Sequence, residues 1–246
     1  MRHTAIGNVI RVGILVTLAS GSSASFGLIQ GELSGGNKTV SFDPDSTGEN
    51  KEYVSGTELT FGVMVDPIPM VPFSLGIQAQ SYGFDFGKQI EDSLIKANPG
   101  TTYSGSYKMA GLLYGPTVKV WAPLPYVKPY LKFTYLTGSE VLKMDFVNSA
   151  GAADSMAVSG SQTATHTGTD LCLGLGYSPI KFVQLYLEYA IHKGKSTLKS
   201  QDIEMTLTSG GSATTAKITS DDLTDEDKKA DTADSKSIRL GVAVGI

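Results

Sequence analysis

The last ten residues, 237–246, alternate strictly between large apolar side chains and small or polar ones. The even positions are apolar throughout: Ile238, Leu240, Val242, Val244 and Ile246. Successive side chains of a β-strand point to opposite faces, so a period of two predicts a strand with one apolar and one polar face. Such a strand fits only a sheet that separates an apolar environment from a polar one.

The same alternation recurs upstream, and it predicts eight strands in all. They cover residues 26–35, 58–65, 73–80, 110–120, 131–135, 170–177, 183–192 and 237–246. Three short turns at 66–72, 122–126 and 178–181 alternate with four long polar links near 36–56, 87–106, 147–164 and 196–234. Connections this short join antiparallel neighbours. The sequence therefore predicts an all-β fold, an eight-stranded antiparallel up-and-down barrel.

Side-chain size indicates which face of these strands is outside. A soluble eight-stranded barrel such as a lipocalin is the structural alternative, and it would place its apolar face inside. The polar face here is rich in glycine at positions 62, 76, 111, 115, 174, 176 and 241. The interior of an eight-stranded barrel is narrow. Small residues therefore belong inside and large apolar ones outside, which predicts a transmembrane β-barrel.

Five charged residues fall on the same inward face: Glu58, Lys132, Asp170, Glu188 and Arg239. Isolated charges in a low-dielectric interior are costly, so these side chains should pair. We expect Arg239 to contact Glu188 on the neighbouring strand and to link Glu58, Asp170, Glu32 and Lys132 into one network. Side chains just fill a barrel of eight strands, so the network predicts a plugged lumen.

The first 25 residues have the pattern of a secretory signal peptide. Arg2 and Arg11 precede a short apolar core at 12–19, and small residues follow at 22–25. The barrel domain is then expected at 26–246. The single cysteine, Cys172, has no partner for an internal disulfide and is expected to be a buried filler. The net charge of −4 argues against a nucleic-acid partner.

Aromatic residues gather at the short-turn ends of the predicted strands. They are Phe73, Trp121, Tyr126, Tyr130, Tyr177 and Phe182. Amphipathic rings favour the boundary between lipid headgroups and hydrocarbon, so these residues predict an aromatic girdle. The alternative is that they are core aromatics at strand ends.

The residues on either side of the 178–181 turn allow a chemical interpretation as well as a structural one. The spacing places Asp170 opposite Glu188 or one pair away, and His166 in the same relation to His192. Facing carboxylates suit acid–base catalysis, and two histidines with a carboxylate suit a metal. The structural interpretation is preferred, because Arg239 neutralises the acids and histidines near a rim are commonly solvated. We therefore predict a candidate rim pair, His166 and His192, with no catalytic residue, no cofactor and no metal.

The C-terminal residues carry a more specific signal. Arg239, Gly241, Val244 and Ile246 match the pattern polar-x-Gly-x-x-apolar-x-apolar of outer-membrane barrel precursors. Together with the strand number and the turn asymmetry, the chain resembles the small eight-stranded bacterial outer-membrane barrels of the OmpA transmembrane-domain, OmpX and OmpW kind. The resemblance implies recognition of the last strand by the barrel-assembly machinery, contact with outer-membrane lipid and lipopolysaccharide, and N- and C-termini in the periplasm.

The function expected from this resemblance is a structural or surface-interaction role, with four extracellular loops available to an extracellular ligand. One alternative is a narrow porin-like channel for ions or small solutes. Another is a lipid-modifying outer-membrane enzyme. No Ser-His-acid set aligns at one height on the predicted strands, so the enzyme remains the minor hypothesis.

Overall fold

A computed structural model describes residues 29–42, 52–67, 71–97, 102–122, 124, 127–149, 155–180, 182–209, 212–222, 224 and 231–245. The expected signal segment 1–25 lies outside the described residues, as do Tyr126 and Ile246. The elements in chain order are β1 (Ile29–Phe42), β2 (Glu52–Val65), β3 (Phe73–Asp85), α2 (Gly87–Ala97), β4 (Thr102–Trp121), β5 (Val127–Ser149), β6 (Ser155–Ile180), β7 (Val183–Ser209), β8 (Ser212–Thr219), η1 (Ser220–Asp222), β9 (Asp231–Thr232) and β10 (Ser235–Gly245).

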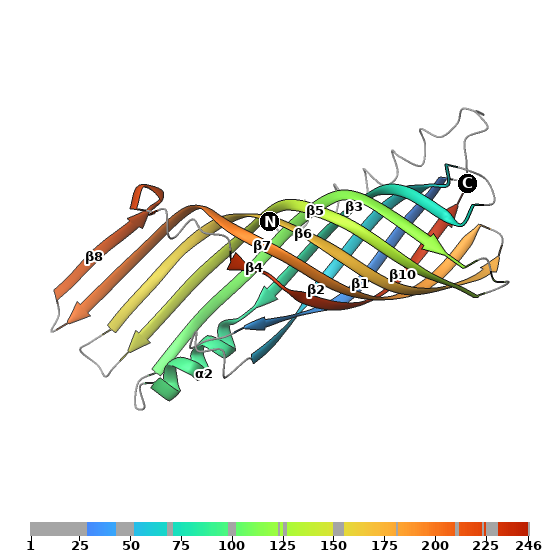
Figure 1. Ribbon diagram of the computed structural model, residues 1–246. Helices are drawn as coiled ribbons and strands as arrows, with labels where there is room; N and C mark the ends of the chain where they lie inside the picture. The colour runs from blue at the N-terminus through green and yellow to red at the C-terminus, as the bar shows by residue number, and fades with distance from the viewer. Residues whose placement is uncertain are drawn as a thin grey trace.

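Eight of the strands form a closed antiparallel ring. Neighbours follow the order β10-β1-β2-β3-β4-β5-β6-β7, and β7 pairs with β10 to close the ring. Leu33 pairs with Val242 across β1 and β10, and Glu188 pairs with Arg239 across β7 and β10. The predicted eight-stranded up-and-down barrel is therefore confirmed (Figure 1).

The barrel presents its apolar side chains outward. Large exposed residues include Leu75, Ile77, Leu112, Phe133, Leu173, Leu185 and Leu240. The charged residues of the opposite face are buried: Glu58, Lys132, Asp170, Glu188 and Arg239. This arrangement confirms a transmembrane barrel and excludes the lipocalin alternative, in which the two faces would be exchanged. Among the described residues, no helix is both long and apolar enough to span a membrane.

The two ends of the barrel differ. The reversals between β2 and β3, β4 and β5, and β6 and β7 lie at the end where β10 finishes, which we call the turn rim (Figure 1). The opposite end, which we call the tall rim, carries α2 and a sheet that continues past the ring (Figure 1). The strands β1 to β3 have 13 or 14 residues, whereas β5 to β7 have 23 to 27. One side of the wall is therefore much taller.

The tall rim corrects the predicted long links. Much of the segments 147–164 and 196–234, expected to be loops, lies in strands: β5 runs to Ser149, β6 starts at Ser155, and β7 runs to Ser209. These extensions are rich in Ser and Thr and lie beyond the ring, where neither face needs to be apolar. The alternation that marks a half-buried strand is therefore missing from the sequence.

A hairpin outside the ring extends the tall side further. The strand β8 pairs with β7 from Asp202 to Ser209, and all of its side chains are exposed. Lys217 Nζ lies 3.1 Å from Glu204 Oε2, and the hydrogen bond to this carboxylate raises the pKa of Lys217. The short strand β9 also pairs with β7. This side of the barrel therefore ends in a single-layered polar sheet.

Three layers of side chains fill the interior. On the tall-rim side lies a buried cluster of Val54, Tyr82, Phe84, Phe86, Leu113 and Leu136, against which Ile90 of α2 packs. On the turn-rim side, Tyr130, Tyr186 and Ala243 form a second cluster with Trp121 packed against it. The rings of Tyr130 and Tyr186 meet edge to face, with centroids 6.5 Å apart. The charged residues occupy the layer between these clusters.

Candidate functional site in the barrel interior

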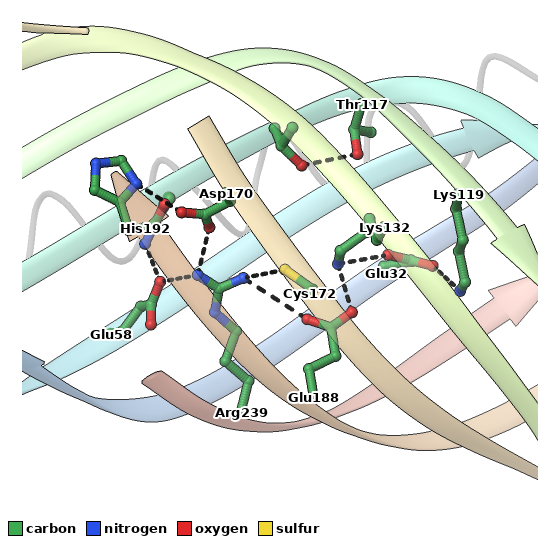
Figure 2. A network of polar contacts seen from close by, with 12 residues as sticks. Glu32, Glu58, Thr117, Lys119, Lys132, Asp170, Cys172, Glu188, His192 and Arg239 are labelled. Atoms are coloured by element: carbon green, nitrogen blue, oxygen red, sulfur yellow. Dashed lines mark hydrogen bonds and ion pairs between the residues drawn. The ribbon is translucent and has the colours of Figure 1, made fainter. Parts of the chain in front are cut away.

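Arg239 is the centre of the charged layer. Its Nη2 atom lies 2.7 Å from Glu58 Oε1 and 2.6 Å from Asp170 Oδ2. Its Nη1 atom lies 3.7 Å from Glu188 Oε2 and 3.4 Å from the sulfur of Cys172. Figure 2 shows the guanidinium group between these partners. One cation thus contacts three buried carboxylates.

A second set of contacts extends the layer toward the turn rim. Lys132 Nζ lies 2.5 Å from Glu188 Oε1 and 3.6 Å from Glu32 Oε2. Lys119 Nζ lies 2.6 Å from Glu32 Oε1 and 4.2 Å from the ring centroid of Tyr130, which is a cation–π contact. Glu188 joins the two sets, and all seven residues are buried. We call them the central ionic network: Glu32, Glu58, Lys119, Lys132, Asp170, Glu188 and Arg239.

The network crosses the full width of the barrel. In the ring order, β2 and β6 stand opposite each other, and so do β1 and β5. Arg239 joins Glu58 of β2 to Asp170 of β6, and Lys132 of β5 reaches Glu32 of β1. Ion pairs therefore connect strands on opposite sides of the interior, not only neighbours (Figure 2).

The sequence pattern places these charges on one face but does not give their pairings. Arg239 and Glu188 are register partners, as expected, yet the shorter contacts of Arg239 are with Asp170 and Glu58. Parity along a strand gives the face of a residue, whereas contacts across the interior depend on the tilt and stagger of all the strands. That information is absent from any single segment.

Three further polar residues contribute to the interior and were missed. Lys38 stands over the ring of Tyr82, with its Nζ 4.1 Å from the centroid. Tyr82 in turn donates a hydrogen bond to Glu140, and so does Ser196. Lys38 lies past the predicted strand end at 35, Glu140 past the end at 135, and Ser196 past the end at 192. Extending the parity of each strand would have found them.

The two histidines lie in one hydrogen-bonded chain at the tall-rim side of the network. His166 Nε2 is 2.7 Å from His192 Nε2, and His192 Nδ1 is 2.6 Å from Asp170 Oδ1. His166 Nδ1 is 2.9 Å from Ser196 Oγ and 3.1 Å from Glu140 Oε1. Both rings are buried, with centroids 4.9 Å apart. The expectation of solvated rim histidines is therefore wrong.

The register around these residues also corrects the prediction. Asp170 pairs with His192, Glu188 pairs with Gly174, and His166 pairs with Ser196. The predicted turn at 178–181 placed Asp170 opposite Glu188 or one pair away, and His166 in the same relation to His192. The reversal instead lies between Ile180 and Val183, and an irregularity follows Tyr177. This displacement separates the two carboxylates, and the two histidines meet on a diagonal.

Glycines on the inward face make room for rings on the neighbouring strand. Tyr82 pairs with Gly111, Tyr130 with Gly174 and Tyr186 with Gly241. A Cβ atom built on any of these three glycines would overlap the tyrosine ring. The inward glycines thus permit the tyrosines to lie flat against the wall.

The aromatic girdle is only partly consistent with the structure. Tyr177 and Phe182 are about half exposed, and Phe73 lies on the outward parity of β3. Tyr130 is buried and donates a hydrogen bond to Glu188, 2.9 Å away, and Trp121 packs on the Tyr130 cluster inside. The assignment of Tyr130 and Trp121 to the girdle is therefore wrong, because position near a strand end was weighed without parity. Tyr126 lies outside the described residues.

The C-terminal pattern divides between the two faces of β10. Arg239 and Gly241 face the interior, where Gly241 accommodates Tyr186. Val244 faces outward and is about half exposed, and Ile246 lies outside the described residues. The role of the C-terminal pattern as an assembly signal stays a prediction.

The hydrogen bonds limit the chemistry of Ser196. A serine hydroxyl has one hydrogen, and here it points to Glu140 Oε2, so it is not given to His166. The hydroxyl is thus not arranged as a nucleophile with His166 as its base. Within the part of the chain that the structure describes, no group of three or more His, Cys, Asp or Glu side chains could hold a metal ion.

Several solved structures of outer-membrane proteins are similar to this chain at low sequence identity. No family model and no curated protein matches the chain. Among solved structures, the chain is similar to Neisserial surface protein A, with 13% identity over 88% of this chain and 96% of that one, and a TM-score of 0.41. It is similar to a major outer membrane protein from Thermus thermophilus, with 13% identity, coverage of 87% and 99%, and a TM-score of 0.40. It is also similar to Ail, the attachment invasion locus protein of Yersinia pestis, with 14% identity, coverage of 88% and 98%, and a TM-score of 0.38.

Proposed function

We propose that this chain, an eight-stranded transmembrane β-barrel, is a plugged outer-membrane barrel that presents its tall rim to the cell exterior. Its role in this proposal is structural and surface-interacting, and it does not conduct ions. The observation that carries it is the central ionic network, because Arg239 and Lys132 link opposite strands of the barrel.

The plug is supported by the depth of the filling. An ion crossing the interior would have to separate pairs such as Arg239 with Asp170 and Lys132 with Glu188, whose atoms are 2.6 and 2.5 Å apart. Separation leaves charges buried and uncompensated, which is strongly unfavourable. The apolar cluster around Phe84 and the ring pair Tyr130 and Tyr186 add uncharged layers on either side.

The surface role is supported by the asymmetry of the two rims. Outer-membrane barrels have short periplasmic turns and long extracellular segments. The turn rim fits the periplasmic side, and we propose that both chain ends and the C-terminal assembly signal lie there. The tall rim, with its Ser- and Thr-rich extensions of β5 to β8, then stands among lipopolysaccharide headgroups and is open to an extracellular ligand.

A plugged interior predicts no ionic current through the protein in planar bilayers. We expect the refolded protein to give no steady single-channel conductance, because the ion pairs close the interior at several depths. The measurement is current recording after insertion, with heat-dependent gel migration of the same sample as the control for a closed barrel. Steady conductance from the folded protein would support the narrow porin-like channel instead.

The orientation predicts which rim an antibody reaches. An epitope inserted after Ser209, in the β7–β8 connection, should be labelled on intact cells. The matched insertion after Ile180, in the β6–β7 turn, should be labelled only after the outer membrane is permeabilised. Labelling of the Ile180 insertion alone on intact cells would reverse the proposed orientation.

A further inference from the structure

The histidine pair, His166 and His192, carries an inference that does not depend on the plugged or surface role. An ionised carboxylate can accept hydrogen bonds but cannot donate one, so the ring nitrogens that face ionised Asp170 and Glu140 must carry hydrogens. Asp170 Oδ1 faces His192 Nδ1 at 2.6 Å. Glu140 Oε1 faces His166 Nδ1 at 3.1 Å.

Ser196 supports the same assignment for His166. Its only hydroxyl hydrogen goes to Glu140 Oε2, so Ser196 Oγ accepts from His166 Nδ1. With both Nδ1 atoms protonated, the Nε2 atoms of His166 and His192 present lone pairs to each other across 2.7 Å. Two lone pairs at this distance repel unless a positive charge lies between them.

The charge of the interior points the same way. Among the described residues, the buried carboxylates are those of Glu32, Glu58, Glu140, Asp170 and Glu188. The buried cations are Lys38, Lys119, Lys132 and Arg239. Five negative groups stand against four positive ones, so one further unit of positive charge between the two imidazoles makes the interior neutral.

The surroundings of the pair are those of metal ligands. Ligating histidines commonly donate the other ring nitrogen to a carboxylate, which fixes the ring and raises its basicity. Both His166 and His192 have such a partner, and their free nitrogens converge. Gly168 and Gly194, which pair with each other, leave the ring faces clear: a Cβ atom on Gly194 would lie 2.5 Å from His166 Nε2.

The two ring nitrogens must separate to hold a metal ion, because they now lie 2.7 Å apart. Two metal–nitrogen bonds of about 2 Å each require the Nε2 atoms to move apart by roughly 1 Å.

We propose that His166 Nε2 and His192 Nε2 form a two-coordinate site for a monovalent copper ion, which exchanges with a proton shared by the rings. Imidazole suits copper, a pair of ligands suits the linear geometry of the monovalent ion, and its single charge matches the deficit. One Cu⁺ enters and one proton leaves, so the net charge and all oxidation states are unchanged. This proposal departs from the expectation of no metal.

The test uses the full refolded chain under anaerobic conditions, with Cu⁺ offered from a coloured chelator that loses absorbance when it gives up the metal. We expect one Cu⁺ per chain and release of one proton. Both His166→Gln and His192→Gln should weaken binding by more than about 100-fold, beyond the loss caused by an outer-shell partner.

A second pair of variants separates ligation from folding. Gly194→Ala keeps both histidines but places a methyl group between the rings, so it should abolish uptake. Gly31→Ala is the matched control, because a Cβ atom there meets only Val244 O at 4.0 Å, and it should leave uptake unchanged. Heat-dependent gel migration shows that each variant is folded.

Three results would overturn the site. They are no copper transfer to the folded parent, unchanged transfer to both histidine variants, or X-ray absorption of bound copper showing sulfur ligands. Nitrogen ligation with two neighbours is the expected spectrum.

Discussion

Replacement of Arg239 by alanine is expected to lower the free energy of unfolding by about 3 to 5 kcal/mol. The change leaves Glu58, Asp170 and Glu188 in the interior without their shared cation. The two nearest carboxylates then repel each other and have no access to bulk water. Urea titration of the barrel in detergent, followed by the fluorescence of Trp121, measures the loss.

Two controls make this result specific. Lys108→Ala removes a cation whose Nζ lies 3.9 Å from Asp85 Oδ2, with both side chains more than half exposed, and should cost at most about 1 kcal/mol. Arg239→Lys keeps the charge but loses the branched geometry that reaches several carboxylates, so an intermediate loss is expected. Equal stability of Arg239→Ala and the parent would contradict the central ionic network.

Replacement of Leu185 by arginine is expected to cost about 2 to 4 kcal/mol, the range for a cation on the lipid face near the bilayer midplane. Leu185 faces outward from β7 and is 48% exposed. The loss should be measured in lipid vesicles, because a bilayer has a defined hydrocarbon thickness and a detergent micelle does not. Only in a bilayer does residue 185 have a defined depth.

The same strand offers a matched control. Leu207 also points outward from β7 and is 51% exposed, but it lies in the segment that pairs with β8, beyond the ring. Leu207→Arg should therefore change the free energy of unfolding by less than about 0.5 kcal/mol, as most surface substitutions do. A large loss at Leu207 with none at Leu185 would show that the membrane surrounds a different level of the barrel from the one assigned here.

The wall of the barrel could be predicted because it separates two environments. From Ile238 to Val244, and again from Val183 to Ile191, alternate residues meet lipid or the interior, and residue type reflects this contrast. Parity then placed Glu58, Lys132, Asp170, Glu188 and Arg239 inside, where the structure has them.

The tall rim was predicted poorly for the same physical reason. Residues of β6 before Thr165 and of β7 after Ser196 have water on both faces, so no alternation marks them as strands. Glu140 and Ser196 stand where this wet segment meets the interior, and they were missed. The helix α2 occupies a predicted loop, where Ile90 packs on the aromatic cluster.

Contacts inside the barrel depend on geometry that local patterns do not contain. The displaced turn before Val183 moved His192 opposite Asp170 and removed Glu188 from that position. Likewise, the parity of β5 puts Tyr130 inside, but its assignment to the girdle rested on position near a strand end alone. The Tyr130–Gly174 pair shows that a large inward ring requires glycine at the paired position on the neighbouring strand.

The strands β5 to β7 continue from the ring into the tall rim without a break in their pairing apart from one irregularity between Thr163 and Ala164. The outer sheet is therefore joined to the ring through strand pairing that is continuous on either side of this irregularity. Glu140, His166 and Ser196 stand where the outer sheet meets the ring, so the hydrogen bonds that hold the His166 ring belong to strands that extend into that sheet.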